Sequence, residues 1–210
     1  MNGAEALVQT AAEAGLEVCF ANPGTTELPL VGALDAEPRV RPVLTLFEGV
    51  ATGAADGYAR IAGRPALALL HLGPGLANGA ACLHNARRAA SPVVTVVGDH
   101  ASWHLPHDPP LASDVAGLAA TVSVWVHSSQ TPAALAGDLR AAVAAASGYG
   151  GPATLVVPAD VQWNAAEDMT VAATPDAATP ALGPRPRRTD IPQGSVRAAA
   201  DALGSDRPAA

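Results

Sequence analysis

Val93-Val-Thr-Val-Val-Gly98 decides the fold, because this run is too apolar to leave either of its faces in water. A strand buried on both faces is typical of a parallel sheet with helices packed above and below it. On both sides of this run the chain alternates short apolar segments with segments whose apolar residues recur at helical spacing. The alternation predicts an α/β fold, with a mainly parallel sheet and helices on both faces.

The other elements follow from the same two patterns and from turn residues between them. Strands are expected at residues 17–20, 40–46, 66–71, 93–98, 122–126 and 153–157, and helices at residues 3–14, 27–34, 48–61, 75–89, 132–146 and 195–203. Residues 99–113 are rich in His, Pro and Asp and follow a strand end. Open parallel sheets bind ligands beyond such ends, so this loop is a candidate for substrate contacts.

Composition and charge exclude several classes of protein. The 210 residues are 49% hydrophobic and carry a net charge of −7, so the chain can bury a sizeable core but has no basic face for a nucleic acid. The N-terminus has no basic leader before an apolar block, and no run of about 18 apolar residues occurs. We therefore predict a cytoplasmic protein without nucleic-acid or membrane partners.

One carboxylate stands at the junction between an expected strand and an expected helix. Glu48 follows Leu44-Thr-Leu-Phe47, and its neighbours are apolar or very small. The helix after it contains Gly49, Gly53 and Gly57, each of which lowers helix propensity by up to about 1 kcal/mol relative to Ala. Repeated glycines on one helix indicate that another backbone or a flat ligand comes very close.

Three motifs follow successive expected strands. They are Asn22-Pro-Gly-Thr-Thr-Glu27, the Glu48 segment with Ala55-Asp-Gly-Tyr-Ala-Arg60, and Gly73-Pro-Gly-Leu-Ala-Asn78. In this order they resemble the N-terminal pyrimidine-binding domain of thiamine-diphosphate enzymes such as acetolactate synthase, benzoylformate decarboxylase and pyruvate decarboxylase. The resemblance runs from residue 3 to about residue 160, and it implies that domain's fold.

The resemblance implies a catalytic role for Glu48, as the carboxyl that activates the aminopyrimidine of thiamine diphosphate. The reaction it implies is decarboxylation of a 2-keto acid, with or without addition of the product to a second carbonyl. The residues that match cofactor contacts of the family are Glu48, Pro23, Gly24, Gly73, Pro74 and Asn78.

On the substrate side, the resemblance implies that the Thr25 hydroxyl lies near the substrate. It also implies that the His71 imidazole binds the substrate and takes part in catalysis. The alternatives are that Thr25 only caps a helix and that His71 only bonds a neighbouring carbonyl. His100, His104 and His107 crowd the loop after the fourth strand. Because histidine titrates near neutral pH, His104 and His107 are candidates for a proton relay at the substrate, whereas structural roles or a metal site are the alternatives.

The family holds the cofactor's diphosphate through Mg²⁺ on a Gly-Asp-Gly motif, which this chain lacks. The nearest match, Gly98-Asp99-His100, belongs to the pyrimidine-domain pattern and is not predicted to bind metal. The chain is therefore expected to carry half of a cofactor site. The other half, with Mg²⁺, is expected on the diphosphate-binding domain of another subunit in a homodimer or homotetramer.

The predicted organisation is a pyrimidine-binding domain at residues 1–160, a Pro/Ala-rich linker at 161–192, and the first helix of a truncated middle domain at 193–210. The alternative to a truncated chain is a separate subunit that meets a diphosphate-binding subunit. Any FAD site would require the missing middle domain.

The sequence is compatible with two other functions and disfavours a third. Acetolactate synthases usually carry Phe-Gln-Glu where this chain has Leu105-Pro-His-Asp-Pro-Pro-Leu111. Asn22-Pro-Gly and His71 resemble benzoylformate decarboxylase, so an enzyme of that kind is the first alternative. A non-catalytic α/β assembly module is the second. A dinucleotide-binding fold is disfavoured, because the glycines after residue 72 do not form the three-glycine phosphate turn.

Overall fold

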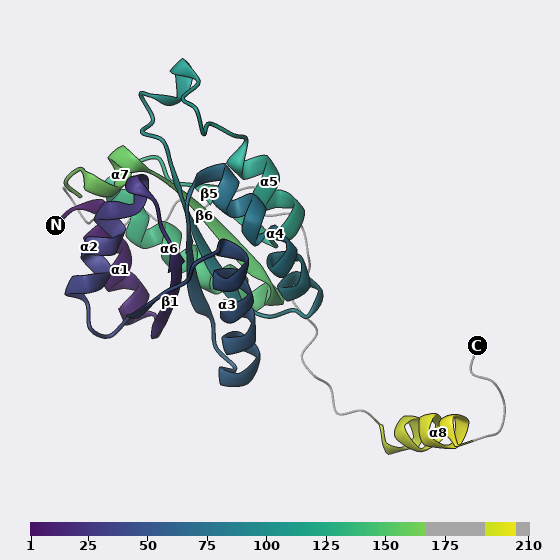
Figure 1. Cartoon of the computed structure of the whole chain (residues 1–210). Coiled ribbons are helices and arrows are strands. Elements are labelled where there is room, and N and C mark those ends of the chain that lie inside the picture. Colours follow the sequence, from purple (N-terminus) through teal and green to yellow (C-terminus); the bar gives the residue numbers. More distant parts are fainter. Residues whose placement is uncertain (167–191, 205–210) are drawn as a thin grey trace.

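The computed structural model describes residues 1–166 and 192–204. In this part of the chain six strands form one sheet in the order β2-β1-β3-β4-β6-β5, and every neighbouring pair is parallel (Figure 1). The strands are β1 Val18–Asn22, β2 Arg41–Leu44, β3 Ala66–Leu70, β4 Val93–Asp99, β5 Trp125–Ser128 and β6 Pro152–Pro158. The predicted α/β fold is confirmed.

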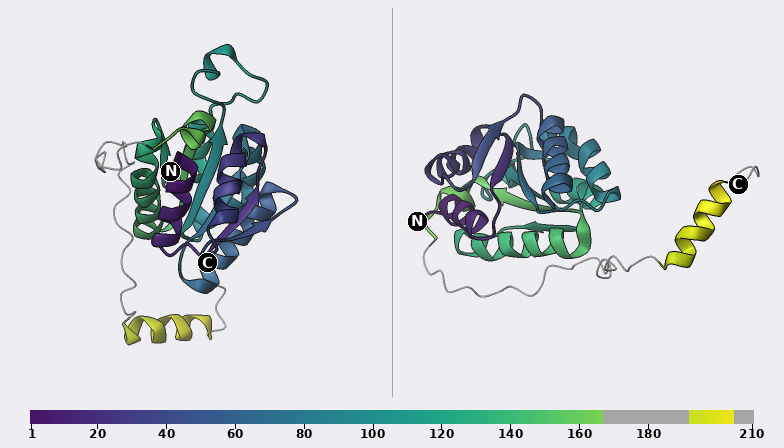
Figure 2. Two further views of the ribbon diagram at one scale, coloured as in Figure 1. Left: turned by 90° about the vertical axis from the view of Figure 1, so that its left-hand side faces the viewer. Right: turned by 90° about the horizontal axis from the view of Figure 1, so that it is seen from below.

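Helices cover both faces of the sheet (Figure 1 and Figure 2). The covering helices are α1 Gly3–Glu13, α2 Leu28–Ala36, α3 Glu48–Ala62, α4 Leu72–Arg88, α5 Val115–Val122 and α6 Leu135–Ala145. The described residues also form the short α7 Ala159–Trp163 and α8 Gln193–Leu203. One core lies between the sheet and α1, α2 and α6, and a second lies between the sheet and α3, α4 and α5.

Alternate side chains of the central strands point to opposite faces of the sheet and so contribute to both cores. Leu67 and Leu69 of β3 pack in the core beneath α1, α2 and α6, whereas Ala66, Ala68 and Leu70 pack in the core beneath α3, α4 and α5. All residues of β4 are buried. The two-sided burial that its apolar sequence predicted is therefore confirmed.

The main differences from the predicted elements lie at the start of α4 and before β5. Helix α4 begins at Leu72 rather than at Gly75, and the predicted strand at residues 122–126 is replaced by the end of α5 followed by β5. Asp114 caps α5, accepting a hydrogen bond of 2.8 Å from the Gly117 amide. This short helix was missed because its Val and Thr residues have strand propensity and its capping signal lies within a Pro- and Asp-rich loop.

Helices α3 and α4 come close through small residues. A Cβ on Gly79 would lie 2.9 Å from Thr52 Cγ2, and Thr52 Oγ1 donates a hydrogen bond of 3.1 Å to the Gly79 carbonyl. A Cβ on Gly53 would lie 3.3 Å from Cys82 Sγ. Among the glycines of α3, Gly53 thus faces a side chain of α4, whereas Gly57 has no neighbour within 4 Å, so the backbone or flat ligand expected beside these glycines stays a prediction.

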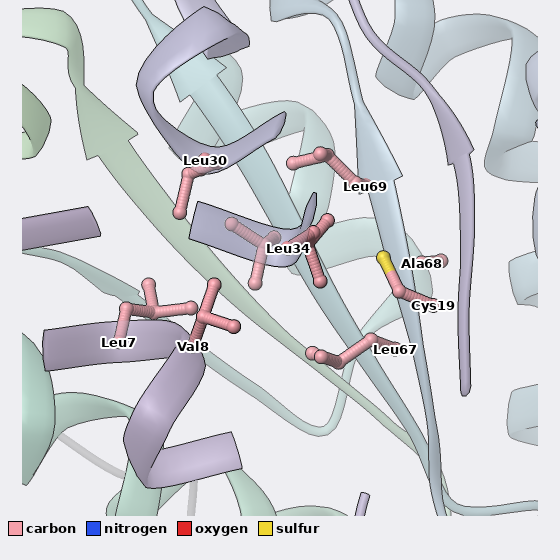
Figure 3. Close-up of a pocket in the computed structure, with 9 residues that line it drawn as sticks. Leu7, Val8, Cys19, Leu30, Leu34, Leu67, Ala68 and Leu69 are labelled. Carbon is pink, nitrogen blue, oxygen red and sulfur yellow. The ribbon is translucent and has the colours of Figure 1, made fainter. Parts of the chain in front are cut away.

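A small cavity lies in the core beneath α1 and α2 (Figure 3). Its wall is apolar and consists of Leu7, Val8, Cys19, Leu30, Leu34, Leu67, Ala68, Leu69 and Val96. Burial raises the pKa of the Cys19 thiol to about 12, so this thiol is protonated at neutral pH. The cavity is therefore a gap in core packing and offers no polar group to orient a ligand.

The C-terminal part is only partly described. Helix α8 buries none of its residues within the described chain. The expected linker at residues 161–192 lies largely outside the described residues, so the division into domain, linker and middle-domain helix stays a prediction. Across residues 1–166 and 192–204, every helix is too short or too polar to cross a membrane.

Candidate active site

The candidate site lies where the strand order changes direction. The chain passes from β1 to β2 on one side and then returns to β3 on the other side of β1. In open parallel sheets, ligands bind beyond the carboxyl ends of the strands at such a switch point. The segments after β1, β2 and β3 carry Glu27, Glu48 and His71, respectively.

Glu48 is the first residue of α3 and is 9% exposed. The turn before it is tied to the end of β1, because Asn22 Nδ2 donates to the Thr45 carbonyl at 2.7 Å and the Thr45 amide donates to the Ala21 carbonyl at 2.8 Å. Asn78 Nδ2 of α4 donates a hydrogen bond of 3.0 Å to Glu48 Oε2. The turn before Glu48 is therefore tied to the end of β1, and the carboxyl group itself is held by α4.

Gly75 separates Glu48 from His71. A Cβ at this glycine would lie 3.0 Å from Glu48 Oε1 and 3.5 Å from His71 Cβ. The missing side chain thus leaves space beside the Glu48 carboxyl group and the His71 Cβ. Among the described residues Glu48 Oε1 receives no hydrogen bond, whereas Oε2 is engaged by Asn78. One carboxyl oxygen is available to a ligand.

Glu27 has no exposed surface and is the centre of a second group of polar contacts. Its Oε2 accepts a hydrogen bond of 2.7 Å from the Gly24 amide and lies 2.8 Å from His71 Nδ1. Its Oε1 accepts a hydrogen bond of 2.5 Å from Thr26 Oγ1, and that hydroxyl lies 3.2 Å from His71 Nδ1. The structure therefore places His71 against a buried carboxylate rather than a carbonyl.

No contact with His71 was predicted for Glu27 or Thr26, although both belong to the first motif. The available signal was a glutamate at the third position of a helical turn, from which its carboxylate reaches back to the amide of the capping residue, here Gly24. That this glutamate also bonds His71 depends on strand adjacency, which the motif does not reveal.

Two glycines make room for this group. A Cβ on Gly24 would overlap the His71 ring, and a Cβ on Gly98 of β4 would overlap the Glu27 carboxylate. Asp99, which follows Gly98, is 9% exposed. Burial raises the pKa of Asp99, the backbone amide and the charge of His100 act in the opposite direction, and the negative charge of Glu27 raises it further.

The other predicted cofactor and substrate residues are more dispersed. Thr25 is exposed next to this group, and Pro23 is half-buried. A Cβ on Gly73 would overlap the side chain of Ser113, while Pro74 is exposed. These positions border the site without a contact that assigns their roles.

The loop histidines form a group of their own. The His104 ring stacks on Trp103 with centroids 5.3 Å apart and meets the His100 ring edge-on at 5.7 Å, while His107 is exposed. This loop extends beyond the carboxyl end of the sheet (Figure 1). In the described part of the chain no hydrogen bond joins His104 or His107 to Glu48 or His71, and no cluster of three or more His, Cys, Asp or Glu residues could hold a metal ion.

Comparison with known proteins identifies the family. Residues 1–118 match the family described as "Thiamine pyrophosphate enzyme, N-terminal TPP binding domain". The chain belongs to this family. Thiamine pyrophosphate is another name for thiamine diphosphate, so the resemblance inferred from the three motifs is confirmed.

Relatives of this thiamine pyrophosphate domain include acetolactate synthases. The chain is 61% identical over 164 residues to a "Putative acetolactate synthase large subunit IlvX" of Mycobacterium tuberculosis, covering 78% of this chain and 32% of the relative. It is 38% identical over 114 residues to a benzoylformate decarboxylase of Pseudomonas aeruginosa, covering 54% of this chain and 21% of that protein. The chain thus spans a third or less of the length of these relatives.

A solved structure confirms the fold. Benzoylformate decarboxylase from Polynucleobacter necessarius superimposes with a TM-score of 0.75 at 23% identity, covering 85% of this chain and 34% of that one. The residues of the thiamine pyrophosphate domain also fit the pyrimidine part of the cofactor, because Glu48 offers one unengaged carboxyl oxygen beside the space left by Gly75.

Proposed function

We propose that this chain forms the pyrimidine-binding half of an active site that uses thiamine diphosphate to act on a 2-keto acid. The whole protein would be an acetolactate synthase-like carboligase or decarboxylase. The observation that carries the proposal is Glu48, a nearly buried carboxyl group whose Oε2 is held by Asn78 while its Oε1 is left to a ligand. Family membership supports the identity of the cofactor.

Glu48 would share a proton between Oε1 and the ring nitrogen of the aminopyrimidine. Asn78 would keep the carboxyl group from turning away, because its bond to Oε2 fixes the plane in which Oε1 meets the ring. When bound there, the cofactor would supply a carbon nucleophile for chemistry at the keto group of the substrate. Pro23, Gly24, Gly73 and Pro74 would shape the surrounding wall.

The partner would be the diphosphate-binding domain of another subunit, which would also bring the Mg²⁺ ligands. Support comes from large apolar side chains that are exposed on both sides of the buried Glu48. They are Leu44, Leu46, Phe47 and Val50, and Leu46 is 94% exposed. Clusters of exposed apolar side chains mark protein interfaces. We therefore place the partner over this cluster, in a homodimer or homotetramer, and we place the protein in the cytoplasm.

His71 and Thr25 would face the 2-keto acid, with His104 and His107 approaching from the loop after β4. Acetolactate synthase-like chemistry ranks first because the putative acetolactate synthase relative is similar over most of this chain. Benzoylformate decarboxylase-like chemistry ranks second, supported by the similarity to the decarboxylase of Pseudomonas aeruginosa. The comparisons offer no support for a non-catalytic assembly module.

The test uses the complete protein or assembly that contains this chain, with thiamine diphosphate and Mg²⁺ added. Exchange of the thiazolium C2 proton with deuterium is followed by NMR in the wild type and in Glu48→Gln. Because a positioned acid contributes about 10²- to 10⁴-fold, the variant should exchange at least about 100 times more slowly. Glu13→Gln, at an exposed glutamate of α1, is the control. An exchange rate that is unchanged in Glu48→Gln would reject the proposed function.

A further inference from the structure

The Glu27 carboxylate is enclosed by groups that donate hydrogen bonds. It is completely buried, and it receives the Gly24 amide and the Thr26 hydroxyl at 2.7 and 2.5 Å. An ionised carboxylate can only accept hydrogen bonds, so the site is matched to that group. Its remaining polar neighbour is His71 Nδ1 at 2.8 Å.

These contacts determine which nitrogen of His71 carries the proton. Thr26 Oγ1 uses its hydrogen for Glu27 Oε1, so toward His71 Nδ1 it presents a lone pair. With Glu27 ionised, Nδ1 therefore faces two acceptors and is itself the donor. A neutral imidazole has a single N–H, which leaves Nε2 unprotonated whenever His71 is neutral.

The surrounding backbone holds the ring in this position. Gly24 lies against one side of the ring, and Gly98 provides the space that the Glu27 carboxylate occupies. The turn after His71 passes through Leu72, a buried non-glycine residue with φ 54. Such a left-handed conformation persists only where packing enforces it, and it is common at functional sites.

The ring is the part of this group that is open to a ligand. The side chain of His71 is 24% exposed, against 0% for Glu27, and Gly75 lies between the His71 Cβ and Glu48 Oε1. We propose that Glu27 is a positioning residue for His71, which holds the ring proton on Nδ1 so that only Nε2 gains or releases a proton at the substrate. The role toward substrate rests on the proposed function, whereas the placement of the proton does not.

The first test needs neither cofactor nor substrate. The 210-residue chain is labelled with ¹⁵N-histidine, and two-bond ¹⁵N–¹H correlations report the tautomer of each neutral ring, with the His71 signals assigned from their loss in His71→Gln. The expected result is a protonated Nδ1 and a bare Nε2. A wild-type spectrum in which Nε2 carries the proton would overturn the proposal without any variant.

Variants of Glu27 then test whether this carboxylate holds the proton of His71 on Nδ1. Loss of a hydrogen bond to a charged group should reduce the Nδ1–H to Nε2–H ratio of His71 about tenfold or more in Glu27→Ala. Glu27→Gln should retain the ratio, because an amide oxygen can still accept from Nδ1. His127, whose Nε2 lies 3.4 Å from Asp138, is an internal control for folding and should not change. An unaltered His71 ratio in a folded Glu27→Ala would contradict the proposal.

The second test uses the complete assembly. Glu27→Ala should lower kcat for the 2-keto acid about ten- to a hundredfold, with recovery in Glu27→Gln, while C2-proton exchange stays at the wild-type rate. Absence of C2 exchange in the wild type would reject the proposed function and leave the tautomer result standing. Normal exchange together with unchanged kcat in Glu27→Ala would reject the role of Glu27 alone.

Discussion

Asn78 Nδ2 donates a hydrogen bond of 3.0 Å to Glu48 Oε2, which joins α4 to the first residue of α3. The two helices follow different strands, so this bond ties together two strand ends at the carboxyl group on which the proposed function depends. Asn78 itself is exposed, so its contribution is expected in the chemistry rather than in the stability of the fold.

We predict that Asn78→Ala slows C2-proton exchange of thiamine diphosphate about tenfold in the complete assembly, because Glu48 loses a hydrogen bond worth about 1.5 kcal/mol. The melting temperature of the chain should stay close to that of the wild type. Asn85→Ala changes an exposed asparagine on the same helix and should affect neither quantity. Equal exchange rates in the two variants would argue against a role for Asn78.

The exposed apolar cluster of Leu44, Leu46, Phe47 and Val50 predicts that a charge introduced there weakens association with the partner. Leu46→Asp should prevent association with the diphosphate-binding partner, because a carboxylate would have to be desolvated at the interface. Ile61→Asp is the matched control, since Ile61 is 92% exposed at the other end of α3. Sedimentation velocity of both variants checks the prediction, and it is wrong if Leu46→Asp associates like Ile61→Asp.

The raised pKa of Asp99 predicts that Asp99→Asn is more stable than the wild type, by an amount that depends on pH. Because burial raises its pKa in the folded chain, the unfolded chain releases this proton first as pH rises, and folding is weakened above the unfolded pKa of about 3.9. Asp99→Asn removes this cost and can still accept the His100 amide. Its melting temperature should therefore exceed that of the wild type at pH 7, with a difference that shrinks toward about pH 4. A difference that is constant with pH would show another cause.

The packing of α3 against α4 predicts that replacing glycine by alanine has opposite effects on stability at Gly79 and at Gly57. Gly79→Ala should lower the free energy of unfolding by about 1–3 kcal/mol, because its Cβ would lie 2.9 Å from Thr52 Cγ2. Gly57→Ala, which meets no atom within 4 Å, should raise it by up to about 1 kcal/mol through better helix propensity. Urea denaturation of both variants measures the two values, and equal signs would contradict this view of the helix contact.

Several features could be predicted because their signals are local. The apolar run of β4, the helical spacing of the segments around it and the glycine- and proline-rich turns between them predicted the α/β alternation. The position of Glu48 at a strand-to-helix junction was likewise visible in the sequence, as were the three motifs that led to the family. Alternation, turn chemistry and motif spacing depend on neighbouring residues, so the sequence by itself determined the fold class, the family and the candidate carboxylate.

The pairing of Glu27 with His71 was decided only by tertiary structure. The two residues are 44 positions apart, and they meet because β1 and β3 are neighbours in the sheet although β2 lies between them in the chain. The burial of Glu27 also depends on Gly98, which belongs to a third strand. Strand order brings these groups together, and the residue pattern of a single segment does not predict strand order.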